Sequence, residues 1–290
     1  FALWIKAKPE TLMQWQSPWG MGFPGWHIEC SAMSAKYLGR EFDIHGGGMD
    51  LAATHHTNEI AQSEACSRHQ PAKYWMHTNM LTVNGTRMSK SKGNGFLPGE
   101  LFTGNHPLLN KGYSPMTVKF FMLQAHYRST LDFSNEALEA SEKGFRRLMN
   151  AVSLLPKLVA SDEGTMQIDQ IRENCISAMN DDFNSPVVIA ELFEAVRIIN
   201  TVYDGTAKIN AAELDKLKLL MNDFVFEVFG LKDEDSSNTE LNEVLDMVIA
   251  LRKDAKENKD YATSDQIRVG LQNIGIQLKD SKEGTTWSKN

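Results

Sequence analysis

Residues 41–48 read EFDIHGGG, and residues 76–83 read MHTNMLTV. Both are short apolar segments bounded by turn-forming residues, and the stretch AATHHTNEIAQSEA between them favours a helix. Most of the tryptophans and a large share of the glycines also fall in the first 130 residues. The sequence therefore predicts alternating strands and helices, an α/β domain, over residues 1–130.

Helical patterns dominate from Ser134 onward. Ser134 can cap a helix whose apolar residues recur every three or four positions. Two more helices are predicted, one in VVIAELFEAVRIINTVYDG after the segment MNDDFNSP, and one in AAELDKLKLLMNDFVFEVFG, which should stop at Gly230. Residues 131–232 are thus predicted to form an all-α bundle. The polar run KDEDSSNTE predicts a linker before a small C-terminal unit, within residues 233–290.

Composition limits the class of protein. The 290 residues are 42% hydrophobic, enough for two or three domains with their own cores. The formal net charge of -7 argues against RNA binding through bulk charge, so any nucleic-acid contact must be local. Three scattered cysteines form no disulfide framework and fit a reducing cytosol. We find no membrane-spanning run and no secretory signal, which predicts a cytoplasmic protein without a membrane partner.

Residues 54–59 read THHTNE and suggest metal ligands. His55 and Glu59 lie four positions apart on a predicted helix and share a face, whereas His56 is expected to point elsewhere. Cys30 lies upstream in GWHIECSAM. A thiolate, an imidazole and a carboxylate are all acceptable zinc ligands, so these three residues are a candidate zinc site. The alternative is a solvated helix face beside a small buried cysteine.

A basic loop follows, RMSKSKGN at residues 87–94. Arg87, Lys90 and Lys92 interleave with two serines. Cations and hydroxyl donors in one loop can stabilise the charge that grows on a polyphosphate leaving group. The alternative reading is an ordinary exposed basic turn.

These motifs together resemble one enzyme family. RMSKSKGN resembles the KMSKS segment of class I aminoacyl-tRNA synthetases, with Arg87 in place of the first lysine. GWHIECSAM, DIHGGGMDL, HHTNE and RMSKSKGN occur in the order and approximate spacing of cysteinyl-tRNA synthetases. The similarity continues through AHYRSTLDFSNEAL and MNDDFNSP to YATSDQIRVGLQNIGIQLKDSKEGTTW near the C-terminus.

The resemblance implies both a fold and an activity. The fold would be part of a Rossmann-type class I catalytic domain, then a DALR-like helical bundle that binds tRNA, then a small C-terminal unit for the anticodon region. The activity would be ATP-dependent ligation of L-cysteine to tRNA(Cys) through cysteinyl-adenylate, with Mg²⁺ accompanying the ATP.

The resemblance also assigns a zinc ion to Cys30, His55 and Glu59. The thiolate of the substrate cysteine would fill the open coordination position. Cysteine and serine differ by one atom, and ordinary pocket contacts separate such analogues poorly. A metal that prefers thiolate would select between them without an editing domain.

Other residues receive roles through the same resemblance. Trp26 would wall the amino-acid pocket, and His45 and Asp50 would contact the cysteine and the adenylate. Gly47, in the triplet between them, would let the backbone approach ATP. From the residues alone, Trp26 could equally be a core residue and the triplet a tight turn.

The phosphate-binding and catalytic roles fall on the basic loop. Lys90 would contact the ATP phosphates during adenylate formation, and Lys92 and Arg87 would reinforce it. His56 and Asn58 receive no role and are expected to be helix-surface or supporting residues.

The chain also departs from the family pattern. It contains neither a HIGH-type motif nor a counterpart of the family's first zinc cysteine. We therefore expect a C-terminal portion, one protein ligand short of a complete zinc site, that does not aminoacylate by itself. Residues 96–115 form a longer segment than usual and are expected to be a surface insertion.

Two other functions fit parts of the pattern. A ligase that joins cysteine to an amino sugar in thiol biosynthesis would share the adenylation motifs but has little need of the long helical half. A non-catalytic fragment could bind only RNA or another protein. Substitution of Cys30 and Lys90 distinguishes them, because a pure binding module should not respond to either change.

Overall fold

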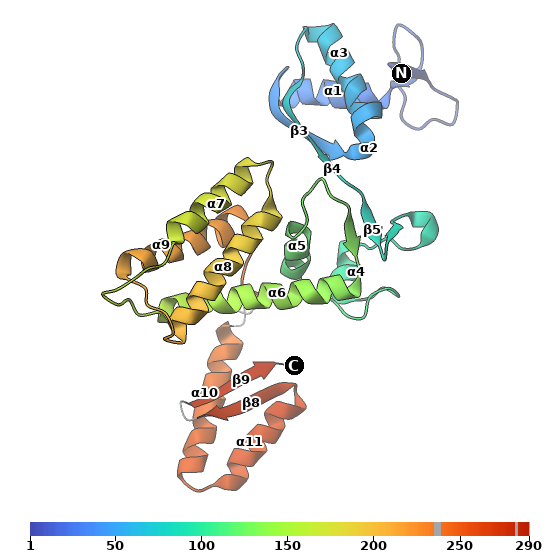
Figure 1. Ribbon diagram of the computed structural model, residues 1–290. Helices are drawn as coiled ribbons and strands as arrows, with labels where there is room; N and C mark the ends of the chain where they lie inside the picture. Colours follow the sequence, from blue (N-terminus) through green and yellow to red (C-terminus); the bar gives the residue numbers. More distant parts are fainter. Residues whose placement is uncertain (235–238, 282–283, 290) are drawn as a thin grey trace. The chain divides into compact units, whose positions relative to one another are not determined.

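The computed structural model describes residues 1–234, 239–281 and 284–289 (Figure 1). The contacts divide the chain into two compact units, Phe1–Leu231 and Lys232–Asn290, and each is described by itself. An α/β part is followed by helices, which confirms the predicted class of α/β plus all-α. The predicted domain boundary near residue 130 stays a prediction.

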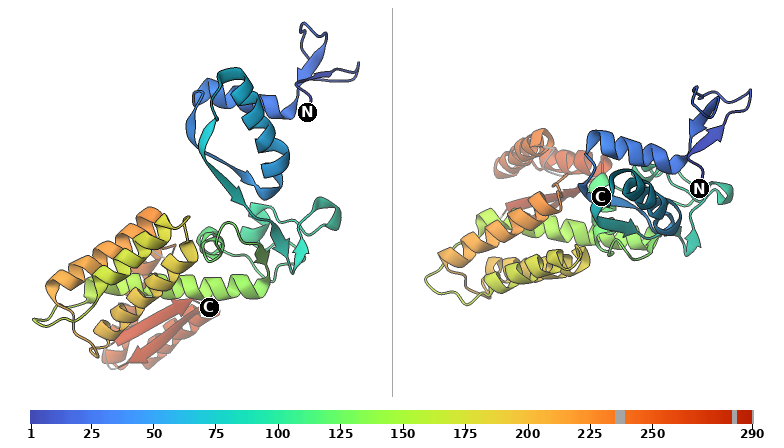
Figure 2. Two further views of the ribbon diagram at one scale, coloured as in Figure 1. Left: turned by 45° about the horizontal axis from the view of Figure 1, so that its top comes forward. Right: turned by 90° about the horizontal axis from the view of Figure 1, so that it is seen from above.

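A parallel strand pair organises the first part of the chain. EFDIHGGG forms strand β3, which pairs in parallel with β4. Parallel neighbours need a crossover connection, and here it is helical. Figures 1 and 2 show α1 and α3 next to each other beside this pair. The elements are β1 (Trp4–Lys6), β2 (Gly22–Pro24), α1 (Trp26–Tyr37), β3 (Phe42–Gly48), α2 (Met49–Leu51), the π-helical turn η1 (Ala52–His56), α3 (Thr57–Ser67) and β4 (Ala72–Thr78).

The run MHTNMLTV belongs to two strands instead of one. Its first three residues end β4, and its last three form β5 (Leu81–Val83). The break falls at Asn79, whose backbone N–H donates to the Tyr127 carbonyl at 3.0 Å. β5 pairs in parallel with β7 (Leu131–Phe133) and antiparallel with β6 (Thr86–Arg87).

The segment at residues 96–115 is more than the surface insertion we expected. Leu101 and Tyr113 are buried and belong to a core cluster with Phe121 and Phe133. The sequence did not mark these two residues as core, because the few apolar residues of this segment are separated by turn-forming ones. Most of the segment is exposed or partly exposed, and its being an insertion stays a prediction. The elements between β6 and β7 are η2 (Lys90–Lys92), α4 (Pro98–Thr103) and α5 (Pro115–Leu123).

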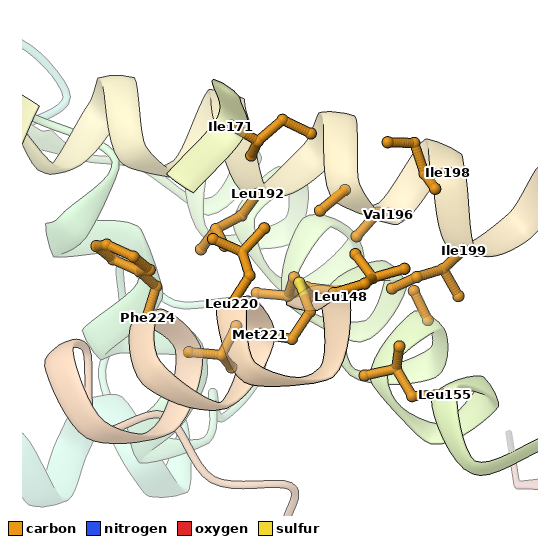
Figure 3. Packing of buried hydrophobic residues seen from close by; sticks show 14 of the residues in the cluster. Leu148, Leu155, Ile171, Leu192, Val196, Ile198, Ile199, Leu220, Met221 and Phe224 are labelled. Atoms are coloured by element: carbon orange, nitrogen blue, oxygen red, sulfur yellow. The ribbon is translucent and has the colours of Figure 1, made fainter. Parts of the chain in front are cut away.

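A helical bundle follows, with the largest buried hydrophobic cluster of the described residues. Ser134 caps α6 as predicted, since its side chain accepts from the Ala137 backbone N–H at 3.2 Å. Gly230 has a positive φ of 56° just after the last helical turn, as predicted for a stop. Figure 3 shows Leu148, Leu192 and Met221 packed together. The elements are α6 (Asn135–Leu154), η3 (Leu155–Lys157), α7 (Ile168–Asn180), α8 (Ser185–Tyr203), α9 (Ala211–Met221) and η4 (Asn222–Val228).

The second unit contains two helices and an antiparallel hairpin, with Leu245, Leu271 and Ile276 buried between them. The elements are α10 (Thr239–Glu257), α11 (Tyr261–Asn273), β8 (Ile276–Ser281) and β9 (Gly284–Lys289). The predicted linker, KDEDSSNTE, falls partly on residues 235–238, outside the described residues, and its last two residues already belong to α10. Among the helices of the described ranges, none is both long and apolar enough to cross a membrane.

Candidate metal and substrate site

The three predicted metal ligands come together from two helices. Cys30 lies on α1, Glu59 on α3 and His55 on the π-helical turn that leads into α3. One ligand atom from each lies within 4.8 Å of the other two. His55 and Glu59 are buried, and Cys30 is half-buried. The spacing of a thiolate, an imidazole and a carboxylate fits one divalent ion between them.

The buried carboxylate gives an independent test of that fit. Glu59 Oε1 lies 2.7 Å from His55 Nε2, but the geometry provides no hydrogen bond to this oxygen. The other nitrogen of the ring, Nδ1, is already 2.7 Å from His27 Nδ1. Buried polar atoms without partners are rare in folded proteins. A cation between the carboxylate and the imidazole would satisfy both, so the donor set fits Zn²⁺.

Burial disfavours the charged forms of all three groups. Burial raises the pKa of the Glu59 carboxyl to about 7. Burial, followed by the charges of Glu59 and Glu29, raises the pKa of the Cys30 thiol. Burial and then His27 lower the pKa of His55. A bound dication would oppose these shifts in the two acids, because it favours carboxylate and thiolate.

We expected His56 to point away from the site, but it points toward it. It is buried, and its Nδ1 lies 2.8 Å from His77 Nε2. The expectation was wrong because positions three apart are also neighbours on a helix, which brings His56 near Glu59. His45, His56 and Glu59 form a second group with ligand atoms within 4.8 Å of one another. Burial first, then His45, His77 and His55, lowers the pKa of His56 to about 4.

Two residues of the site were missed in the sequence. His27 on α1 contacts His55 and lies 3.2 Å from the Asn58 amide nitrogen, so Asn58 supports the cluster. His77 contacts His56 from β4. Their partners are 28 and 21 residues away in the chain. Only the strand register, which places His77 opposite Gly47, could have revealed the second pair.

Trp26 and His45 both contact ligands of the metal group, Trp26 at His55 and His45 at Glu59. The Trp26 ring lies 4.1 Å from the His55 ring, centroid to centroid, and the residue is still 57% exposed. An aromatic wall with a free face beside a metal ligand leaves room for a substrate side chain. His45 Nε2 lies 3.4 Å from Glu59 Oε2, and the pKa of His45 is lowered by burial and then by His55 and His77.

Gly47 lies so close to the histidine cluster that there is no room for a side chain at this position. A Cβ at this position would lie 2.9 Å from His56 Cε1 and 3.0 Å from Leu51 Cδ1. We expect Gly47→Ala to displace His56 and to lower the free energy of unfolding by about 1–3 kcal/mol, measured by urea denaturation. Gly46→Ala is the matched control, because its Cβ would meet only the Met76 carbonyl oxygen at 3.5 Å. Equal losses in both variants would contradict this reading.

The remaining predicted residues lie outside the metal group. Asp50 is exposed on α2, two residues after the glycine triplet. Arg87 and Lys92 are exposed on the basic loop, and Lys90 lies in η2 of the same loop. The Lys90 side chain is outside the described part of the chain.

Asn94, which the sequence did not single out, fixes this loop. Its buried side chain accepts from the Ser89 backbone N–H at 2.9 Å and donates to the Arg87 carbonyl at 3.2 Å. We expect Asn94→Ala to free the loop, so that the Ser89 amide exchanges with deuterium roughly fivefold faster or more, because a side-chain hydrogen bond contributes about 1 kcal/mol or more. Asn84→Ala, in the exposed turn before β6, should leave that amide unchanged.

Comparisons with known proteins agree with this architecture. Residues 1–143 match the family model described as the tRNA synthetases class I (C) catalytic domain, and residues 174–232 match the DALR domain. The fold is therefore that of a class I tRNA synthetase catalytic domain followed by a DALR domain. Curated relatives named cysteine–tRNA ligase, from Porphyromonas gingivalis and Bacteroides thetaiotaomicron, are each 52% identical over 100% of this chain and 60% of their own length.

The chain belongs to the cysteinyl-tRNA synthetase family. It spans about 60% of the length of the curated relatives it matches.

Proposed function

We propose that this chain takes part in attaching L-cysteine to its cognate tRNA at the expense of ATP. The observation that carries the proposal is the grouping of Cys30, His55 and Glu59, with the half-exposed ring of Trp26 against His55. A zinc ion held there would select a substrate thiolate over a serine hydroxyl. His27 and His56, which lie beside these ligands and contact His55 and His77 respectively, would give the ion a hydrogen-bonded surrounding.

The chemistry we propose has two steps. The carboxylate of cysteine attacks the α-phosphorus of ATP, the bond to the β-phosphate oxygen breaks, and pyrophosphate leaves. The terminal ribose hydroxyl of the tRNA then attacks the carbonyl carbon of the adenylate, and AMP leaves. The protein acts mostly by positioning and by stabilising charge.

The roles proposed for individual residues are those that the resemblance to the family implies. Trp26 walls the side of the amino-acid pocket, while His45 and Asp50 flank the glycine triplet at the strand end and contact the cysteine and the adenylate. Gly47 lets ATP approach the backbone. Lys90 and Lys92, with Arg87 nearby in the loop, hold the leaving pyrophosphate, together with Mg²⁺ carried by the ATP.

The family relationship weighs against the rival functions. An amino-sugar ligase needs the adenylation site but not a DALR domain, which matches residues 174–232 here. A pure binding fragment would not need a zinc site with a cysteine, a histidine and a glutamate grouped in this way.

Aminoacylation tests the proposal. The protein in its full natural length should transfer labelled cysteine, and not serine, to tRNA, and should catalyse cysteine-dependent ATP–pyrophosphate exchange. The 290 residues alone are not expected to charge tRNA. Exchange without charging would favour the amino-sugar ligase. If the protein showed neither activity, only the reading as a binding fragment would remain.

A further inference from the structure

An apolar cavity opens at the carboxyl ends of the two parallel strands. It has a volume of about 490 Å³. One side is formed by Gly46 and Gly47 of β3 and by Met76 and Thr78 of β4. The carboxyl ends of parallel strands are where α/β folds bind ligands. Gly47 also touches the His56 ring, so the cavity adjoins the metal site through one strand.

Tyr127, which lies between α5 and β7, also lines the cavity, as does Phe183 at the turn between α7 and α8. The backbone there is unusual, because Asp182 and Phe183 both have positive φ, 57° and 56°. Two successive left-handed residues other than glycine are costly, and such strain persists only where the surroundings enforce it.

The side-chain contacts of Asp182 hold this turn in its strained conformation. Its Oδ1 accepts from the Tyr127 hydroxyl at 2.6 Å, and its Oδ2 lies 2.7 Å from Arg128 Nε. The backbone of Tyr127 is tied in turn to Asn79, the residue after β4. The strained turn thereby aims Phe183 at the strand ends. Phe183 lines the cavity and remains 48% exposed, so the ring has a free face.

The mostly apolar lining of this cavity, with two aromatic side chains, fits a flat, weakly polar ring. Nucleic-acid bases that are not paired stack on Phe and Tyr side chains, and this contact tolerates any base. Arg128 is half-exposed beside Tyr127, where a guanidinium can also meet a phosphate.

We propose that this cavity holds the last unpaired base of the tRNA acceptor end, stacked on Phe183 and Tyr127. The inference rests on the proposed function, because the terminal ribose must reach the adenylate beside the same strand ends. Asp182 is then a positioning residue that fixes both rings. The base is held from the helical side while its ribose faces the glycine triplet.

The test compares intact tRNA with tRNA trimmed of its last nucleotide, bound to the full-length protein. Stacking of one base predicts that trimming weakens the affinity of the wild-type protein roughly tenfold or more. The Phe183→Ala variant should bind both tRNAs with the affinity that the wild-type protein has for the trimmed tRNA. Tyr203→Ala is the matched control, since Tyr203 is 50% exposed at the end of α8 and outside the cavity, and it should keep the full difference.

The outcomes separate the two proposals. If Phe183→Ala still distinguishes intact from trimmed tRNA as the wild type does, the cavity does not hold the base. A raised KM for ATP in pyrophosphate exchange, with discrimination between the tRNAs intact, would assign the cavity to the ATP adenine and also overturn the inference. Failure of the wild type to charge tRNA would instead refute the proposed function. Asp182→Asn provides a second variant, which should lose part of the difference while Phe183 is retained.

Discussion

Cys30→Ser is expected to lower the affinity of the protein for Zn²⁺ by roughly 100-fold or more, because even groups that only support a metal ligand cost about 10–100-fold when removed. A serine hydroxyl is a poor zinc ligand at neutral pH, and the buried Glu59 and His55 would have to hold the ion with two protein atoms. Competition with a colorimetric chelator measures the affinity. Replacement of zinc by cobalt gives a second readout, since the thiolate-to-cobalt absorption should disappear.

Cys66→Ser provides the control for this experiment. Cys66 is exposed on α3, the helix that carries Glu59, and it is outside the group of ligand atoms. Its replacement should leave the affinity for zinc unchanged. Equal affinity of the Cys30→Ser variant and the wild type would remove Cys30 from the metal site and, with it, the main support for thiolate selection.

Leu217→Ala is expected to lower the free energy of unfolding by about 2–5 kcal/mol, through lost burial and the cavity left behind. Leu217 is 0% exposed and lies within the largest hydrophobic cluster. The same α9 helix carries Leu219, which is 53% exposed, so Leu219→Ala removes the same atoms without opening a cavity.

Urea unfolding followed by circular dichroism measures both variants. We expect the midpoint of the helical transition to fall strongly for Leu217→Ala and to change little for Leu219→Ala. Similar midpoints for the two variants would mean that α9 does not pack as described.

The helical half could largely be predicted from the sequence, because apolar spacing and caps are local signals. Ser134 and Gly230 marked a helix start and a helix stop that the structure confirms. The helix α7 was not predicted, although Ile168, Ile171 and Cys175 are spaced for a buried face. Its first turn has no capping side chain, so no start signal separated it from the loop before it.

The site was predictable only in part, because some of its contacting residues are close in the sequence and others are far apart. His55 and Glu59 share a helix, and their spacing was sufficient to group them. His27 and His77 act through partners on other elements, and no local pattern encodes those contacts. The cavity at Phe183 depends on the strained turn, and a positive φ at a phenylalanine leaves no trace in composition.

Because of the π-helical turn before α3, the number of residues between the glycine triplet and the histidines determines how α3 is rotated against β3. The Thr57 backbone N–H reaches the Ala52 carbonyl, five residues back, so this turn holds one residue more than an α-helical turn. Loss of a single residue between Ala52 and Thr54 would rotate α3 against β3 by roughly 100°. Side chains in this segment can therefore vary among relatives, whereas its length should not, and alignment gaps should avoid it.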